Sequence, residues 1–236
     1  MNFGIILAGG VGARMGIANL PKQYVEVNGK PVLVYTMEKF QACRDIHRII
    51  VVADQAWYPQ IEDWCRQYSI DKFSGFAPPG QTRQQSVFNG LLACEAQRSG
   101  PDDVVSIHDA ARPLVSPALI SAGLVAAKEC DGALAAITTK DTIYHCEDGR
   151  FITGLFNRAT LCCGQTPESF RLDICLELNR KATPADLERF HGCSELAFQY
   201  GLNVRIIPGE EMNFKLTTQE DLDRLYTVLG LPRKQH

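Results

Sequence analysis

The stretch FGIILAGGVGARMG, residues 3–16, joins a short apolar run to a glycine-rich loop that contains a basic residue. The apolar run is far shorter than the roughly 20 residues that span a bilayer, so it is typical of a buried strand. Glycines let the backbone approach a phosphate closely, and Arg14 offers a planar fork to phosphate oxygens. The stretch therefore predicts either a phosphate-binding loop or a strand-to-helix turn without a ligand.

Two well-known phosphate-binding loops do not fit this stretch. The dinucleotide fingerprint G-x-G-x-x-G fails because the glycine after Gly10 and Gly12 is Gly16, one residue too late. The P-loop requires a lysine and a hydroxyl residue directly after its last glycine, and the residues after Gly12 do not supply them. The glycine-rich loop is therefore of another type.

Downstream of this loop, short β-branched runs alternate with amphipathic stretches. Strands are predicted at residues 3–7, 49–52, 104–107, 132–137 and 204–207, and helices at 33–40, 61–68, 86–94, 117–130 and 218–229. Such alternation is typical of a parallel sheet covered by helices on both faces. We therefore predict a single α/β domain over residues 1–236, with a Rossmann-like, doubly wound, mostly parallel sheet whose ligands collect beyond the carboxyl ends of its strands.

Residues 140–161 break this alternation. Asp148-Gly149 is a hairpin turn signal between short β-prone runs at 142–144 and 151–152. Neither flank is long enough to build a core of its own. We predict a β-arm that projects from the sheet and that a second subunit stabilises.

The composition excludes several classes of protein. The 236 residues are 45% hydrophobic and 22% charged, which is ordinary for a globular chain and unlike a disordered one. With a net charge of −3, a polyanion site must concentrate its basic residues locally, and nucleic-acid binding is not expected. The lack of a signal-peptide pattern and of any membrane-length apolar run predicts a cytoplasmic protein, and the nine scattered cysteines predict reduced thiols.

Further motifs follow the glycine-rich loop in order: Pro21-Lys22-Gln23, His108-Asp109-Ala110-Ala111-Arg112-Pro113, Gln165-Thr166-Pro167 and Asn213-Phe214-Lys215-Leu216-Thr217-Thr218. This series, which extends over nearly the whole chain, resembles the family of cytidylyltransferases that act on 2-C-methyl-D-erythritol 4-phosphate or ribitol 5-phosphate. The resemblance implies a Mg²⁺-dependent enzyme that transfers CMP from CTP to a polyol phosphate and releases pyrophosphate. It also implies a homodimer that pairs through the arm.

The resemblance assigns roles to individual residues at the nucleotide. Arg14, Lys22 and Lys215 would be catalytic, because they would offset charge on the phosphates. Asp109, after a predicted strand, would hold Mg²⁺ against the triphosphate. The segment 79–86 resembles the one that reads cytosine, although it also fits a loop followed by a helix start. The expected nucleotide-binding residues are Leu7, Ala8, Gly9, Gly10, Gly12, Arg14, Lys22, Gly80, Arg83, Ser86 and Asp109.

For the acceptor, the resemblance points to Arg112, Thr142, Arg158 and Lys215. Thr142 and Arg158 belong to the predicted arm and would complete the site of the neighbouring subunit. For Arg112, a surface ion pair with Asp109 is the structural alternative.

The sequence departs from the family pattern at several positions. His191-Gly192 stands where Thr-Asp is usual near the polyol, and Met212 stands where some members carry an acid. Phrases such as Gly29-Lys30-Pro31 are closer to the ribitol 5-phosphate branch, which makes that acceptor the first expectation and 2-C-methyl-D-erythritol 4-phosphate the alternative. Outside enzymes, the alternative is a non-catalytic nucleotide-binding regulatory protein.

Overall fold

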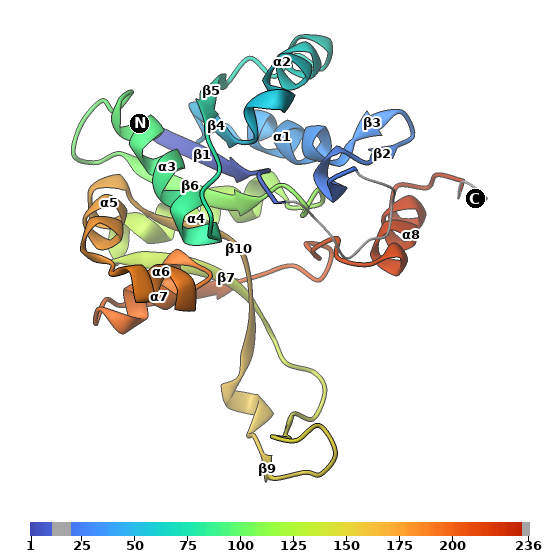
Figure 1. Cartoon of the computed structure of the whole chain (residues 1–236), viewed down its shortest axis with the longest axis vertical. Helices are drawn as coiled ribbons and strands as arrows, with labels where there is room; N and C mark the ends of the chain where they lie inside the picture. The colour runs from blue at the N-terminus through green and yellow to red at the C-terminus, as the bar shows by residue number, and fades with distance from the viewer. Residues whose placement is uncertain (11–19, 233–236) are drawn as a thin grey trace.

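The computed structural model describes residues 1–10 and 20–232, and the statements below concern those residues. Their centre is a seven-stranded sheet (Figure 1). In spatial order its strands are β11 (Val204–Pro208), β7 (Gly132–Thr138), β10 (Cys162–Arg171), β6 (Val104–Asp109), β1 (Asn2–Leu7), β4 (Arg48–Val52) and β5 (Phe73–Ala77). Strand β10 runs antiparallel to β6 and β7, and the other pairings are parallel. The prediction of a mostly parallel sheet is confirmed.

Helices cover both faces of the sheet, as the alternation predicted. Along β1, Ile6 packs into one apolar cluster, whereas Phe3 and Ile5 pack into the other, because successive strand side chains point to opposite faces. The first cluster includes side chains of α1 (Val32–Ala42), α2 (Tyr58–Gln67) and α4 (Pro117–Glu129), and the second those of α3 (Arg83–Glu95), α5 (Leu172–Lys181) and α7 (Cys193–Gln199). The remaining helices are α6 (Pro184–Arg189) and α8 (Gln219–Val228). No helix in the described part of the chain has the length and apolarity needed to cross a membrane.

Several elements differ from the sequence prediction. Strands β5 and β10 and the helices α5 to α7 were not predicted. Lys215 lies in an irregular segment, because residues 209–218 contain no strand. A hydrogen bond to a distant part of the chain holds this segment in place, since Leu216 N donates to Ala111 O at 2.8 Å.

Residues 140–161 form the predicted arm, which projects away from the sheet between β7 and β10 (Figure 1). Its strands β8 (Tyr144–His145) and β9 (Gly154–Leu155) pair antiparallel. At the turn, Gly149 has a φ of 70°, and Asp148 Oδ1 accepts from Phe151 N at 3.0 Å. The arm exposes five large apolar side chains, namely Tyr144, Phe151, Ile152, Leu155 and Phe156.

Candidate active site

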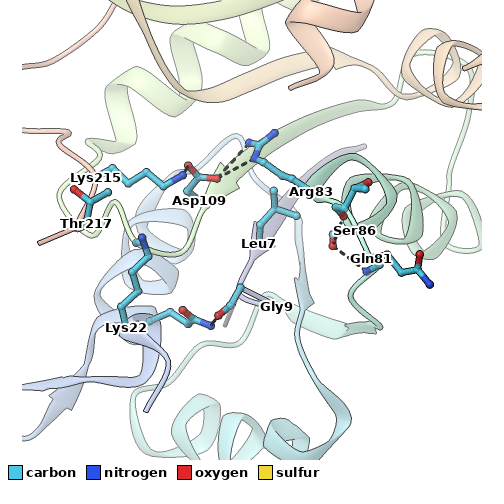
Figure 2. Close-up of a pocket in the computed structure, with 14 residues that line it drawn as sticks. Leu7, Gly9, Lys22, Gln81, Arg83, Ser86, Asp109, Lys215 and Thr217 are labelled. Atoms are coloured by element: carbon cyan, nitrogen blue, oxygen red, sulfur yellow. Dashed lines mark hydrogen bonds and ion pairs between the residues drawn. The ribbon is translucent and has the colours of Figure 1, made fainter. Parts of the chain in front are cut away.

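A cavity of about 600 Å³ opens beyond the carboxyl ends of β1 and β6 (Figure 2). Nine residues expected at the site line it: Leu7, Gly9, Gly10, Lys22, Gly80, Arg83, Ser86, Asp109 and Lys215. Five others were not predicted: Gln23, Gln81, Thr82, Ala111 and Thr217. Each of these five residues is next to a predicted residue in the sequence or belongs to one of the motifs quoted above. Their position in the sequence could therefore have identified them. Gly12 and Arg14 lie outside the described residues.

The loop after β1 is fixed by close packing and by one buried side chain. A Cβ on Gly9 would lie 2.5 Å from the Cβ of Pro79, so only glycine lets the loops after β1 and β5 meet. Gln23 Nε2 donates to Ala8 O at 2.6 Å and to Gly10 O at 2.8 Å. Gln23 therefore ties this loop to the segment that carries Lys22. Ala8, which was expected at the nucleotide, is buried and does not line the cavity.

The second loop is shaped by the start of α3. Ser86 Oγ accepts from Gly80 N at 2.9 Å and donates to Thr82 O at 3.0 Å. Thr82 is the N-cap, because its hydroxyl accepts from Gln85 N at 3.1 Å. This segment therefore begins a helix and also lines the cavity, and its contact with cytosine stays a prediction.

Three cationic side chains surround the carboxylate of Asp109. Arg83 Nη2 lies 3.2 Å from Oδ1, and Lys215 Nζ lies 2.8 Å from Oδ2. Figure 2 shows these two groups reaching Asp109 from opposite sides. The third, Arg112 Nε, lies 3.8 Å from Oδ2. Burial alone would raise the pKa of Asp109, but the charges of Arg83, Lys215 and Arg112 hold that pKa well below its ordinary value.

The cavity concentrates positive charge. Lys22, Arg83 and Lys215 are cationic residues of its lining, and Asp109 is an anionic one. A chain with a net charge of −3 needs such local enrichment to bind a polyanion.

Arg112 does not line the cavity. Its side chain is 12% exposed, and its Nη1 donates to Asn213 O at 2.7 Å. The ion pair with Asp109 considered for Arg112 is present, but it is largely buried and not at the surface. A contact between Arg112 and a substrate stays a prediction.

A buried hydrogen-bonded chain orients the turn that carries Asp109. His108 Nε2 lies 3.1 Å from Arg112 O, and because a carbonyl oxygen only accepts, this nitrogen carries the proton. His108 Nδ1 therefore accepts from Thr166 Oγ1 at 3.0 Å, and the same hydroxyl accepts from Asp109 N at 3.2 Å. Burial lowers the pKa of His108 to about 4, so the ring is neutral near pH 7.

The two acceptor residues expected in the arm lie away from this cavity. Arg158 is in the short helix η4 (Arg158–Thr160), where its Nη1 donates to Lys140 O at 2.8 Å. Thr142 is exposed in the same arm. Neither residue lines the cavity of its own chain.

The described residues contain no group of three or more His, Cys, Asp or Glu side chains arranged to hold a metal ion. Among the described residues that line the cavity, Asp109 is the one with a carboxylate. One carboxylate suits a metal ion that is bound mainly by substrate phosphates, and it does not suit a metal enclosed by protein ligands.

Comparison with known proteins identifies the family. Residues 3–230 match the family model described as IspD, 2-C-methyl-D-erythritol 4-phosphate cytidylyltransferase. A ribitol-5-phosphate cytidylyltransferase of Streptococcus agalactiae serotype Ia is 34% identical over 221 residues, 94% of this chain and 92% of that protein. A 2-C-methyl-D-erythritol 4-phosphate cytidylyltransferase of Rubrobacter xylanophilus is 38% identical over 229 residues, 96% and 94% of the two chains.

Solved structures agree with this result. The 2-C-methyl-D-erythritol 4-phosphate cytidylyltransferase of Francisella tularensis superposes with a TM-score of 0.78 at 26% identity, covering 96% of this chain and 98% of that one. The 4-diphosphocytidyl-2C-methyl-D-erythritol synthase of Anaerococcus prevotii has the same fold, with a TM-score of 0.79 at 24% identity and coverage of 97% and 96%. The chain is a nucleotidyltransferase that belongs to the IspD family of cytidylyltransferases.

Proposed function

We propose that this protein transfers CMP from CTP to D-ribitol 5-phosphate and releases pyrophosphate. The observation that carries the proposal is the cavity at the ends of β1 and β6, where Lys22, Arg83 and Lys215 gather near Asp109 in a chain of this family. The ribitol 5-phosphate relatives and the Gly29-Lys30-Pro31 phrase support that acceptor. The relative from Rubrobacter xylanophilus supports 2-C-methyl-D-erythritol 4-phosphate as the second candidate.

In the proposed reaction, an oxygen of the acceptor phosphate attacks the α-phosphorus of CTP. The bond from that phosphorus to the oxygen bridging the β-phosphate breaks, and pyrophosphate leaves. Both reactants are anions, so the protein must offset their repulsion and hold the reacting atoms in line. Lys22, Lys215 and Arg14 supply this charge, and the backbone of Gly9 and Gly10 approaches the phosphates.

Mg²⁺ is the cofactor of the proposed reaction, and Asp109 is the residue that would hold it. Mg²⁺ commonly takes one or two protein carboxylates together with substrate phosphates. Asp109 fits this requirement because it lines the cavity and its lowered pKa keeps it ionised. Lys215 contacts the same carboxylate through a partly exposed side chain. When bound, the ion supplies positive charge to the triphosphate oxygens.

We also propose that the arm joins two copies of the chain in a homodimer. The exposed apolar side chains of the arm need a partner surface, and Thr142 and Arg158 would then reach the site of the neighbouring subunit. The proposed location is the cytoplasm, where CTP is available and where thiols stay reduced, as the nine free cysteines require.

The test is a pyrophosphate-release assay with purified protein, Mg²⁺ and each nucleoside triphosphate. Ribitol 5-phosphate and 2-C-methyl-D-erythritol 4-phosphate are supplied separately. The proposal expects CTP with ribitol 5-phosphate to give the highest kcat/KM, and a chelator to abolish release until Mg²⁺ is restored. Faster turnover with the other acceptor would replace ribitol 5-phosphate by the second candidate, and CTP binding without release would contradict catalysis.

A further inference from the structure

Glu168 is a buried carboxylate next to the cavity that the proposed reaction does not use. It lies on β10, and its side chain is 5% exposed. Its Oε1 accepts from Arg83 Nη2 at 3.3 Å, and its Oε2 accepts from Ser194 N at 2.7 Å. Burying a charged group is costly unless it is paired and hydrogen-bonded, and Glu168 has both kinds of partner.

The carboxylate of Glu168 occupies the space beside Gly192. A Cβ on Gly192 would lie 3.0 Å from both carboxylate oxygens of Glu168. A side chain at this position would therefore require the Glu168 carboxylate to shift by a few tenths of an ångström. An acidic side chain at 192 would in addition place two negative charges together.

Arg83 connects Glu168 to the cavity. Its Nη1 donates to His191 O, its Nη2 contacts both Glu168 and Asp109, and its Nε donates to Asp109 Oδ1 at 3.4 Å. One guanidinium thus joins the end of β6, the strand β10 and the loop at residues 190–192. Glu168 and Asp109 share one guanidinium nitrogen of Arg83, Nη2.

This wall of the cavity faces the acceptor if the proposed reaction holds. An in-line displacement requires the attacking oxygen to enter opposite the leaving pyrophosphate. The glycine-rich loop and Lys22 form the side suited to the triphosphate, and Figure 2 shows Arg83 and Asp109 across the cavity from Gly9 and Lys22. The polyol phosphate therefore approaches past Arg83 and the 190–192 loop.

We propose that Glu168 is a positioning residue for the acceptor: it fixes Arg83 and the 190–192 loop and so determines how a polyol phosphate is bound. This inference rests on the proposed function. Glu168 does not line the cavity and touches no substrate, so it acts through Arg83 and through the backbone of the loop.

The test compares Glu168→Gln with the wild type in steady-state kinetics. The amide keeps the shape of the side chain but loses its charge, so Arg83 is held less firmly. We expect the KM for the polyol phosphate to rise about tenfold, in keeping with the loss of a charge-assisted hydrogen bond. The KM for CTP should rise less, although Arg83 is also expected at the nucleotide, because Gly9, Gly10 and Lys22 line the nucleotide side of the cavity. Glu95→Gln is the matched control, because Glu95 pairs with Arg180 at 2.7 Å and lies on α3, the helix that begins with Arg83.

A second variant approaches the same contact from the other side. Gly192→Ala places a methyl group against the Glu168 carboxylate and should raise the acceptor KM in the same selective way. Gly100→Ala is its control, since a Cβ there meets no atom within 4 Å. If Glu168→Gln does not fold, the Gly192→Ala variant alone tests whether Glu168 positions the acceptor.

The outcomes separate the inference from the proposed function. A wild type that releases no pyrophosphate with either polyol phosphate contradicts the proposed function. An active wild type whose Glu168→Gln and Gly192→Ala variants change neither KM, or change both equally, contradicts the positioning role alone.

Discussion

Asp109 and Lys215, which both line the cavity, form an ion pair at 2.8 Å, and the two play different parts. Removing Lys215 leaves Asp109 with Arg83 and Arg112, so the buried carboxylate keeps its charge partners and the fold should survive. The lost ammonium, however, is one that offsets charge building on the reacting phosphates. A preorganised group of this kind is worth about 3 to 4 kcal/mol, or a few hundredfold in rate.

We therefore expect Lys215→Ala to lower kcat a few hundredfold while its thermal unfolding midpoint stays close to that of the wild type. Pyrophosphate release and thermal melting measure the two quantities. Lys181→Ala is the control, because Lys181 pairs with Glu177 on an exposed helix surface, where such a pair contributes little. Full turnover in Lys215→Ala would remove this lysine from the reaction.

The residue scale also shows where sequence reasoning reaches its limit. Parallel strands end at the same edge of a sheet, so the sequence predicted Leu7 and Asp109 at one edge, and the structure shows that their strands are neighbours. The direction of a side chain does not follow from its motif. Arg112 lies beside Asp109 in sequence and in space, yet it turns toward Asn213 and away from the cavity.

At the scale of elements, regular segments were predictable and the strand that supports the site was not. Helix α3 begins after Thr82 and α8 after Thr218, each with a capping hydroxyl that the sequence displays. Strand β10 contains a glycine, a proline and a glutamate, which argue against a buried strand. Its polar side chains are buried because they hold the site: Thr166 contacts Asp109, and Glu168 contacts Arg83. Predictions of secondary structure from local sequence fail most often at such functional positions.

The arm is the element whose proposed role can be tested by itself. Phe151 is 72% exposed there, and Phe198 on α7 is 81% exposed away from the arm. We expect Phe151→Asp to convert a dimer into a monomer in light scattering and to lower pyrophosphate release, because a charge opposes burial of that surface and Arg158 no longer reaches the other site. Phe198→Asp should stay dimeric and active. A monomeric wild type, or a dimer unaffected by Phe151→Asp, would contradict pairing through the arm.

At the scale of the whole molecule, the buried ring of His108 couples folding to pH. The pKa of His108 is about 4 in the folded chain, against an ordinary value of 6.5. Between these values the unfolded chain binds more protons, so the free energy of unfolding rises with pH and is lost as pH falls from 6.5 toward 4. The carboxylate of Asp109 has its lowered pKa below this window, so its contribution stays constant there.

From these pKa values we expect the free energy of unfolding to fall by roughly 2 kcal/mol between about pH 7 and about pH 5, measured by urea denaturation. His108→Gln should flatten this dependence, because an amide can donate to Arg112 O and accept from Thr166 without titrating. His145→Gln, which alters a half-exposed ring in the arm, should keep the wild-type slope. If His108→Gln retained that slope as well, another group would take up the proton on unfolding. Low pH would then not act through the hydrogen bonds that join His108, Thr166 and Asp109.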